Sequence, residues 1–158
     1  MHGKGDSMRF EKLDFFQQIN VLKRMHRLLN KHKFDGKLSE VSIDICNIEK
    51  TGDYYAMYIR ACPKFGRFKN GIAFSYSFEE DIEKEKTIRD QVYMIGLIML
   101  HEMIHQYCHE NGIDDSGHNQ NFMDAAKEHG LHSIYKDGNF VEEDSWSVWI
   151  WTENFRIK

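Results

Sequence analysis

The chain has 158 residues, 41% of them hydrophobic and 13% aromatic, which is enough apolar material for one compact domain with a buried core. No apolar stretch is long enough, and free enough of His and Glu, to span a bilayer, so we expect no membrane-spanning segment. The net charge is −4, but residues 1–40 carry nine Lys or Arg against five Asp or Glu, so basic charge collects at the start of the chain.

The first eight residues are polar and lack the apolar core of a signal peptide. We expect residues 1–9 to be a flexible start or a cloning remnant and residues 10–158 to form a single domain. The three cysteines, Cys46, Cys62 and Cys108, do not form the even, paired set that is typical of small secreted domains. Together with the missing signal peptide, this predicts a cytoplasmic protein.

Residues 11–33 predict an amphipathic helix. Its apolar residues recur at helical spacing and are Phe15, Phe16, Ile19, Leu22, Met25 and Leu29. The basic residues that fall largely on the opposite side are Lys23, Arg24, Arg27 and Lys31. Asp35-Gly36 ends the helix, because glycine is the usual helix stop. The basic face is a candidate contact for nucleic acid or an acidic partner, and a solvated helix face is the alternative.

Two strands are expected next. Val41, Ile43 and Ile45 alternate with polar residues, which is the pattern of a half-buried strand. Tyr54–Ala61 predicts a second strand, which Pro63 interrupts.

A tight hairpin is expected at Asn70-Gly71, because a two-residue turn favours residues that accept positive φ. It would join Phe65–Lys69 to Ile72–Phe78 and complete a small antiparallel sheet. An edge strand beside a cleft can pair with the backbone of a bound peptide. We take Ile72–Tyr76 as the candidate for such a strand, with an ordinary sheet strand as the alternative.

A charge-rich linker or short helical turn is expected at Glu79–Lys86, and a long central helix at Thr87–Asn111. Apolar residues surround this helix, namely Val92, Ile95, Leu97, Ile98, Met99, Leu100, Met103 and Ile104. We therefore expect it to be buried on most sides. Burying histidine or glutamate in such a helix costs free energy unless the group is paired or bound to a metal.

The central helix carries the stretch His101-Glu102-Met103-Ile104-His105. Two histidines four residues apart lie on one face of a helix, so both imidazoles can reach one metal ion. Glu102 is then held beside the metal, where a bound water would sit. This is the H-E-x-x-H arrangement of zinc hydrolases.

A third metal ligand is expected because catalytic zinc keeps one position open for water and takes three ligands from the protein. His101 and His105 come from one helix, and His118, in a glycine-containing loop, is the expected third ligand. Imidazole suits zinc, although ligand type alone does not exclude other first-row metals. Asp114 and Asp115 are alternative third ligands.

Two rival metal-binding pairs lie in the same helix. His105 and His109 are also four residues apart, and Cys108 falls near the side of His101. Neither pair places a glutamate beside the metal. The metzincin pattern does not fit, because it needs glycine and histidine where Cys108 and Asn111 stand.

The last third of the chain predicts one more helix and one strand. Asn119–His129 forms the helix, with Phe122 facing inward and Gly130 closing it. Ser145–Thr152 alternates and predicts a strand. Its three tryptophans indicate core and sheet packing, with an aromatic wall for a substrate as the alternative.

Several of these motifs together resemble the SprT-like (Spartan-type) family of zinc metalloproteases. Three stretches carry the resemblance: Phe34 to Leu38 followed by Val41 to Ile43; His101 to Tyr107; and Gly117-His118 with Phe122 close behind. They span about residues 10 to 132. The chain has no Cys-x-x-Cys pair, so we expect no zinc ribbon of the kind that some members carry at the C-terminus.

The predicted elements make an α+β domain, with a small antiparallel sheet of three to four strands packed on the basic first helix and the central helix. The resemblance implies a zincin-like fold of the minimal gluzincin type. It also implies that His101, His105 and His118 bind one zinc ion and that Glu102 is the catalytic base. Protein or peptide substrates follow from it, as does association with DNA, which the net charge of −4 does not support.

We therefore expect a zinc-dependent peptidase. The metal would polarise the scissile carbonyl and acidify a bound water, and Glu102 would carry the proton from that water to the leaving amine. The alternative is a catalytically silent module of the same fold that keeps zinc and binds protein or DNA. A third option is hydrolysis of a substrate other than a protein. Glu102 favours an enzyme, because a purely structural site has no use for a base.

Overall fold

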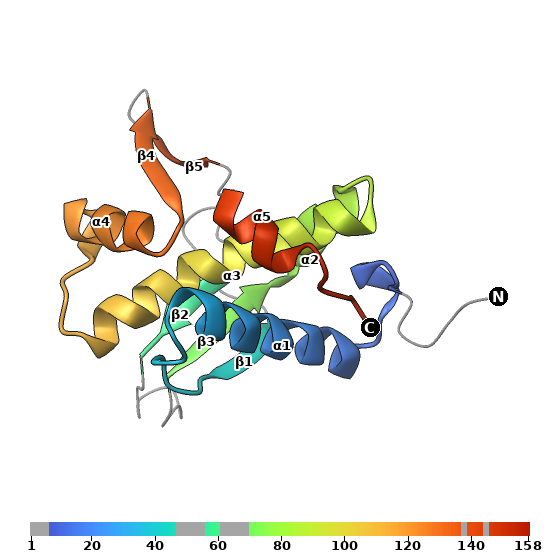
Figure 1. Cartoon of the computed structure of the whole chain (residues 1–158). Helices are drawn as coiled ribbons and strands as arrows, with labels where there is room; N and C mark the ends of the chain where they lie inside the picture. Colours follow the sequence, from blue (N-terminus) through green and yellow to red (C-terminus); the bar gives the residue numbers. More distant parts are fainter. Residues whose placement is uncertain (1–6, 47–55, 61–69, 137–138, 144–145) are drawn as a thin grey trace.

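The computed structural model describes residues 7–46, 56–60, 70–136, 139–143 and 146–158, with the backbone alone described for 132–136, 139–143 and 146–147 (Figure 1). This part of the chain contains five α-helices, a three-stranded mixed sheet and a two-stranded sheet. The expected α+β class is confirmed. No helix in these ranges has the length and apolar character needed to cross a bilayer.

Helix α1 (Phe15–Lys33) begins at a reciprocal cap. The Asp14 carboxylate accepts the backbone N–H of Gln17, and the Gln17 side chain accepts the N–H of Asp14. One 3₁₀ turn, η1 (Phe10–Lys12), precedes the cap, so the helix expected from residue 11 begins four residues later.

The sequence pattern placed the first two phenylalanines of α1 on its apolar face, but in the structure they do not join the core. Phe15 is 46% and Phe16 81% exposed, whereas Leu22, Met25 and Leu29 are fully buried. Phe16 lies about two and a half helical turns before Met25 and therefore faces the opposite side of the helix.

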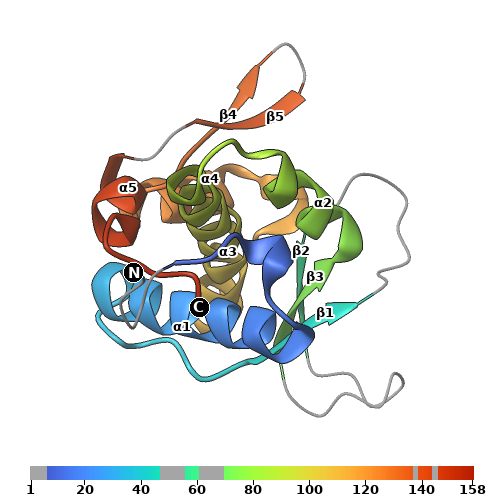
Figure 2. The ribbon, with the colours of Figure 1, turned by 90° about the vertical axis from the view of Figure 1, so that its right-hand side faces the viewer.

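The three-stranded sheet consists of β1 (Ser42–Cys46), β2 (Ala56–Ile59) and β3 (Gly71–Ser75), in the order β1-β3-β2 (Figure 2). β1 is parallel to β3, and β2 is antiparallel to it. The expectation of an antiparallel sheet is therefore wrong. All five residues of β3 are buried, so this strand takes the central place rather than an edge.

The expected tight turn at Asn70-Gly71 is also wrong. Gly71 pairs with Ser42 on one side and Ile59 on the other, as the first residue of β3. It is not among the glycines with positive φ that such a turn requires. The other half of the expected hairpin, Phe65–Lys69, lies outside the described residues.

The candidate substrate strand, Ile72–Tyr76, does not lie at an edge. β3 has a neighbour on both sides and ends at Ser75, whose hydroxyl accepts the backbone N–H of Phe78 and so begins helix α2 (Tyr76–Lys84). The expected charge-rich linker is this helix. The edges of the sheet are β1 and β2.

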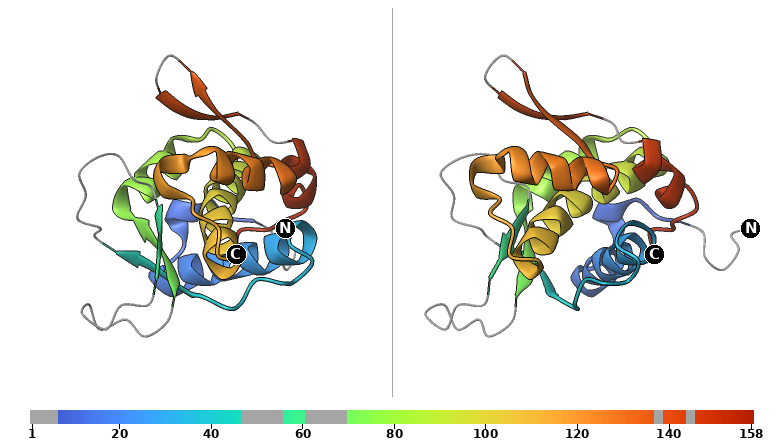
Figure 3. Two further views of the ribbon diagram at one scale, coloured as in Figure 1. Left: turned by 90° about the vertical axis from the view of Figure 1, so that its left-hand side faces the viewer. Right: turned by 60° about the vertical axis from the view of Figure 1, so that its left-hand side comes forward.

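Helix α3 (Ile88–Glu110) is the central element, as expected. It is capped by Thr87 and ends at Asn111. Figure 3 shows α3 enclosed by α1, by helix α4 (Gln120–Glu128) and by the sheet, and β2 packs directly against it. Its fully buried apolar residues include Ile95, Met99, Leu100, Met103 and Ile104.

The segment expected as a strand at Ser145–Thr152 contains helix α5 (Trp146–Thr152) instead. Val148 and Thr152, four residues apart, are both buried against α3, where Gly96 provides the space. This contact between distant parts of the chain overrides the alternating pattern of the segment. Trp149 and Tyr93 pack edge to face.

A two-stranded hairpin, β4 (His132–Lys136) and β5 (Asn139–Glu143), follows α4 and projects beyond the helices (Figures 1 and 2). No strand was expected in this segment. The sequence Asp137-Gly138 between the two strands is a strong hairpin signal.

A buried polar network joins α1, α3 and the segment that leads into β1. His26 donates through Nε2–H to the side-chain oxygen of Gln106, at 2.9 Å. The Gln106 amide donates to the backbone oxygen of Ser39 and to the carboxylate of Glu110. Gln106 is fully buried and directly follows His105, so the network holds the histidine-bearing part of α3 against α1.

The close approach of α3 and α5 gives the first prediction. A Cβ atom at Gly96 would lie 2.8 Å from the Thr152 methyl group, so Gly96→Ala overpacks the contact. We expect it to lower the free energy of unfolding by about 1–2 kcal/mol, because the overpacking exceeds the gain in helix propensity. Urea denaturation measures this.

Thr152→Ser is the matched background for that test. Serine removes the methyl group and can keep the hydrogen bond from the Thr152 hydroxyl to the Val148 oxygen. In this background Gly96→Ala should leave the free energy of unfolding unchanged. An equal decrease in both backgrounds would show that the Thr152 methyl group is not the cause.

The second prediction concerns pH. Burial lowers the pKa of His26 below its ordinary value of 6.5. The unfolded chain then takes up the proton first, so this histidine makes the fold less stable as the pH falls from about 6.5. We expect His26→Gln to flatten the pH dependence of the free energy of unfolding between about pH 7 and 5. Parallel curves for wild type and variant would contradict this role.

Candidate metal centre

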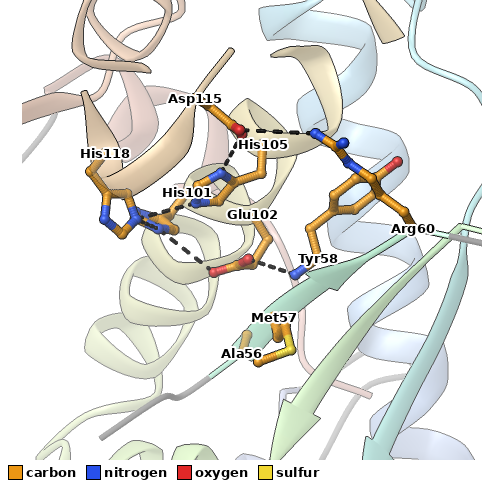
Figure 4. Close-up of a pocket in the computed structure, with 9 residues that line it drawn as sticks. All are labelled: Ala56, Met57, Tyr58, Arg60, His101, Glu102, His105, Asp115 and His118. Atoms are coloured by element: carbon orange, nitrogen blue, oxygen red, sulfur yellow. Dashed lines mark hydrogen bonds and ion pairs between the residues drawn. The ribbon is translucent and has the colours of Figure 1, made fainter. Parts of the chain in front are cut away.

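Three imidazoles converge in a cleft between α3, β2 and the loop that leads into α4 (Figure 4). The Nε2 atom of His118 lies 3.1 Å from Nε2 of His101 and 3.2 Å from Nε2 of His105. The three potential ligand atoms all lie within 4.8 Å of one another. The structure thus brings together the three histidines that the sequence singled out.

The spacing of these nitrogens suits a metal ion. Tetrahedral zinc with nitrogen ligands at 2.0–2.1 Å separates the ligand atoms by about 3.3 Å. The observed separations of 3.1 and 3.2 Å are close to this value. The donor set is imidazole only, which zinc and several other first-row metals accept. The residues present therefore fit one such ion.

The third histidine is presented by a strained turn. Gly117 has φ of 60° and His118 φ of 50°, so two successive residues are in the left-handed region. Glycine adopts this conformation at little cost, and histidine is one of the few other residues found there. Asn119 then caps α4 by accepting the backbone N–H of Phe122. The turn and the cap together direct the His118 ring toward α3.

Phe122 packs against all three histidines, His101, His105 and His118, which we call the trio. Its ring centroid lies 5.1, 4.5 and 4.8 Å from those of His101, His105 and His118, and its side chain is fully buried. Burial and the two neighbouring histidines lower the pKa of His101 well below its ordinary value. Burial, followed by the nearby His105, also lowers the pKa of His118. Both imidazoles therefore favour the neutral form, which is the form that binds metals.

Glu102 lies beneath the histidines and is held by the sheet. Its Oε1 atom accepts the backbone N–H of Tyr58 in β2, at 2.8 Å. Its Oε2 atom lies 3.8 Å from Nε2 of His101. Burial raises the pKa of Glu102 to about 8, which the hydrogen bond from Tyr58 partly opposes. One carboxylate oxygen is thus anchored and the other faces the trio.

The cleft around these groups measures about 220 Å³. The residues that line it are Ala56, Met57, Tyr58, Arg60, His101, Glu102, His105, Asp115 and His118. The Asp115 carboxylate accepts from Nδ1 of His105 at 2.6 Å and has Arg60 at 4.0 Å on its other oxygen. β2 therefore forms the wall of the cleft that was expected from Ile72–Tyr76.

The alternative ligands do not join the three Nε2 atoms. The Asp114 carboxylate accepts from the backbone and hydroxyl of Ser116, and Asp115 contacts the nitrogen of His105 that points away from the other two histidines. His109 lies beside the ring of Tyr58, and Cys108 is fully buried with its pKa raised by burial to about 11. Among the described residues, none of these joins the trio.

Sequence reasoning missed the contribution of β2. Tyr58 and Arg60 line the cleft, yet nothing in their local pattern marks them, because their position depends on how the sheet packs on α3.

Comparison of the chain with protein-family models, with curated proteins and with solved structures finds no match.

The geometry predicts one bound ion per chain. We expect the wild type to carry about one zinc ion after reconstitution and His118→Ala to lose most of it, because a two-imidazole site is much weaker. Metal analysis by mass spectrometry on dialysed protein measures this. His109→Ala is the matched control and should keep the metal. If His118→Ala retained zinc, or His109→Ala lost it, the prediction that His101, His105 and His118 bind the ion would be wrong.

Proposed function

We propose that the chain is a zinc-dependent peptidase with a zincin-like fold, related to the SprT-like family through the stretch His101 to Tyr107 and the Gly117-His118 pair. The observation that carries the proposal is the convergence of three imidazole nitrogens above the free oxygen of a buried carboxylate. Three protein ligands leave a fourth position for water, which distinguishes catalytic from structural zinc sites.

His101, His105 and His118 would hold the ion through their Nε2 atoms. When bound, zinc polarises the carbonyl of a substrate and lowers the pKa of a water molecule to near neutrality. His101 and His118, which are partly buried, keep their lone pairs available because burial disfavours their protonated forms. A set of three imidazoles with Nε2 atoms 3.1 and 3.2 Å apart suits zinc, which we take as the expected ion.

Glu102 is the general base of the proposed reaction. The backbone N–H of Tyr58 fixes one of its oxygens, so the other is the oxygen that accepts the proton of the attacking water. The same carboxyl group then gives this proton to the nitrogen of the leaving amine, and the carboxylate is regenerated. Glu102 is held for this role by its place in α3 and by the hydrogen bond from β2.

The substrate would lie along β2. Among the described residues no strand pairs with the outer edge of β2, and the N–H of Tyr58 on that edge faces Glu102. An extended peptide can add to such an edge through backbone hydrogen bonds, with affinity that depends little on its sequence. This supports a peptide or an unfolded protein segment as the substrate.

Glu102→Gln tests the mechanism. The amide cannot accept the proton, so we expect peptide hydrolysis to fall by about 10²–10⁴-fold, the usual contribution of a general base. The zinc content should stay near that of the wild type. Cleavage of an unfolded protein such as casein, followed by gel electrophoresis and mass spectrometry, measures the loss. Glu128→Gln, at an exposed position of α4, is the control and should cleave normally.

Two outcomes would overturn this function. Normal cleavage by Glu102→Gln would exclude Glu102 as the base. A wild type that holds zinc but cleaves no protein or peptide would favour a binding module that keeps the metal without catalysis.

A further inference from the structure

Asp115 joins both histidine-bearing segments of the proposed metal centre. Its carboxylate lies 2.6 Å from Nδ1 of His105 in α3, and its side chain is only 15% exposed. Its backbone oxygen accepts the N–H of His118 at 3.2 Å, which closes the turn that presents that residue. One residue therefore contacts two of the three histidines, through different atoms.

The contact with His105 determines which of its nitrogens is free. A neutral imidazole carries hydrogen on one nitrogen and a lone pair on the other. A carboxylate only accepts, so Nδ1 of His105 carries the hydrogen and Nε2 has the lone pair. Nε2 is the atom that lies 3.2 Å from His118, inside the trio. Without the carboxylate at Nδ1, the hydrogen could lie on Nε2 instead. Nε2 would then be a hydrogen-bond donor and could not bind a metal.

The other contact of Asp115 is weaker. Arg60 in the cleft wall lies 4.0 Å from Oδ1 of Asp115, and its side chain is 59% exposed. At this distance, and with the Arg60 side chain largely in solvent, water screens the attraction and the ion pair is weak. The short contact with His105 is therefore the stronger of the two side-chain contacts of Asp115.

We propose that Asp115 is a positioning residue of the metal centre, one that fixes the tautomer and the ring orientation of His105. This inference rests on the proposed metal site. Asp115 is not a ligand itself, because its carboxylate lies on the Nδ1 side of the ring, away from the Nε2 atoms. Partners of this kind hold metal-binding imidazoles by accepting from their second nitrogen.

The first test needs no metal. Histidine ring ¹⁵N and ¹³C shifts in the chelator-treated full chain report which nitrogen of His105 carries hydrogen. We expect the Nδ1–H form in the wild type and a mixture of both forms in Asp115→Ala. Asp114→Asn is the matched control, because Asp114 is on the same loop and contacts Ser116 rather than His105. An Nε2–H form in the wild type, or unchanged shifts in Asp115→Ala, would overturn the proposal.

The second test measures zinc affinity by competition with a chromogenic chelator. We expect Asp115→Ala to weaken binding by about 10–100-fold, Asp115→Asn by less because its amide oxygen can still accept, and Asp114→Asn not at all. Circular dichroism of the metal-free variants verifies that they fold, and Asp115→Asn keeps the shape of the side chain. The cobalt(II) spectrum of Asp115→Asn should keep the intensity of a four-coordinate site.

The outcomes separate the two proposals. Zinc binding at wild-type strength by both Asp115 variants, while His118→Ala fails to bind, would overturn the positioning role and leave the metal centre intact. If the X-ray absorption spectrum of zinc-loaded Asp115→Ala lacked a coordinating oxygen that the wild type shows, Asp115 would be a metal ligand. This too would overturn the positioning role. A wild type that binds no zinc, with His105 in the Nδ1–H form, would overturn the peptidase and the metal role of Asp115 together.

Discussion

The cost of burying polar side chains on α3 organises this structure. The helix is apolar on most sides, yet Glu102 and Gln106 are buried on it and His101 and His105 are mostly so. A buried polar group without a partner costs free energy of the order of 1–3 kcal/mol, and more when it is charged. Each of these groups is therefore matched by a partner from another element, and those partners join the rest of the molecule to α3.

The partners come from three directions. Gln106 holds α1 through His26 and the segment that leads into β1 through Ser39, and Glu102 holds β2 through the N–H of Tyr58. Asp115 holds the loop that carries His118. The same hydrogen bonds that satisfy the buried groups also fix the relative positions of the elements that enclose the cleft. Stability and the geometry of the site therefore depend on the same contacts.

Local signals in the sequence predicted the elements that are defined by their own residues. The limits of α3 follow from Thr87 and Asn111, and those of α4 from Asn119 and Gly130. The predictions were wrong where contacts between segments far apart in the sequence determine the structure. The alternation around Val148 resembles a strand, but packing against Gly96 selects a helix, and the place of β3 at the centre of the sheet depends on two partners that are far away in sequence.

The sequence by itself determined which side chains the candidate site offers from α3, because helical periodicity places His101 and His105 on one face, with Glu102 directly after His101. The glycine-containing loop and the suitability of imidazole for zinc likewise singled out His118 as the expected third ligand. Only the tertiary structure decided that β2 rather than β3 forms the cleft wall and that Asp115 contacts His105 on the nitrogen facing away from the trio. Those relations join residues on different elements, and their distances depend on packing that no local pattern encodes.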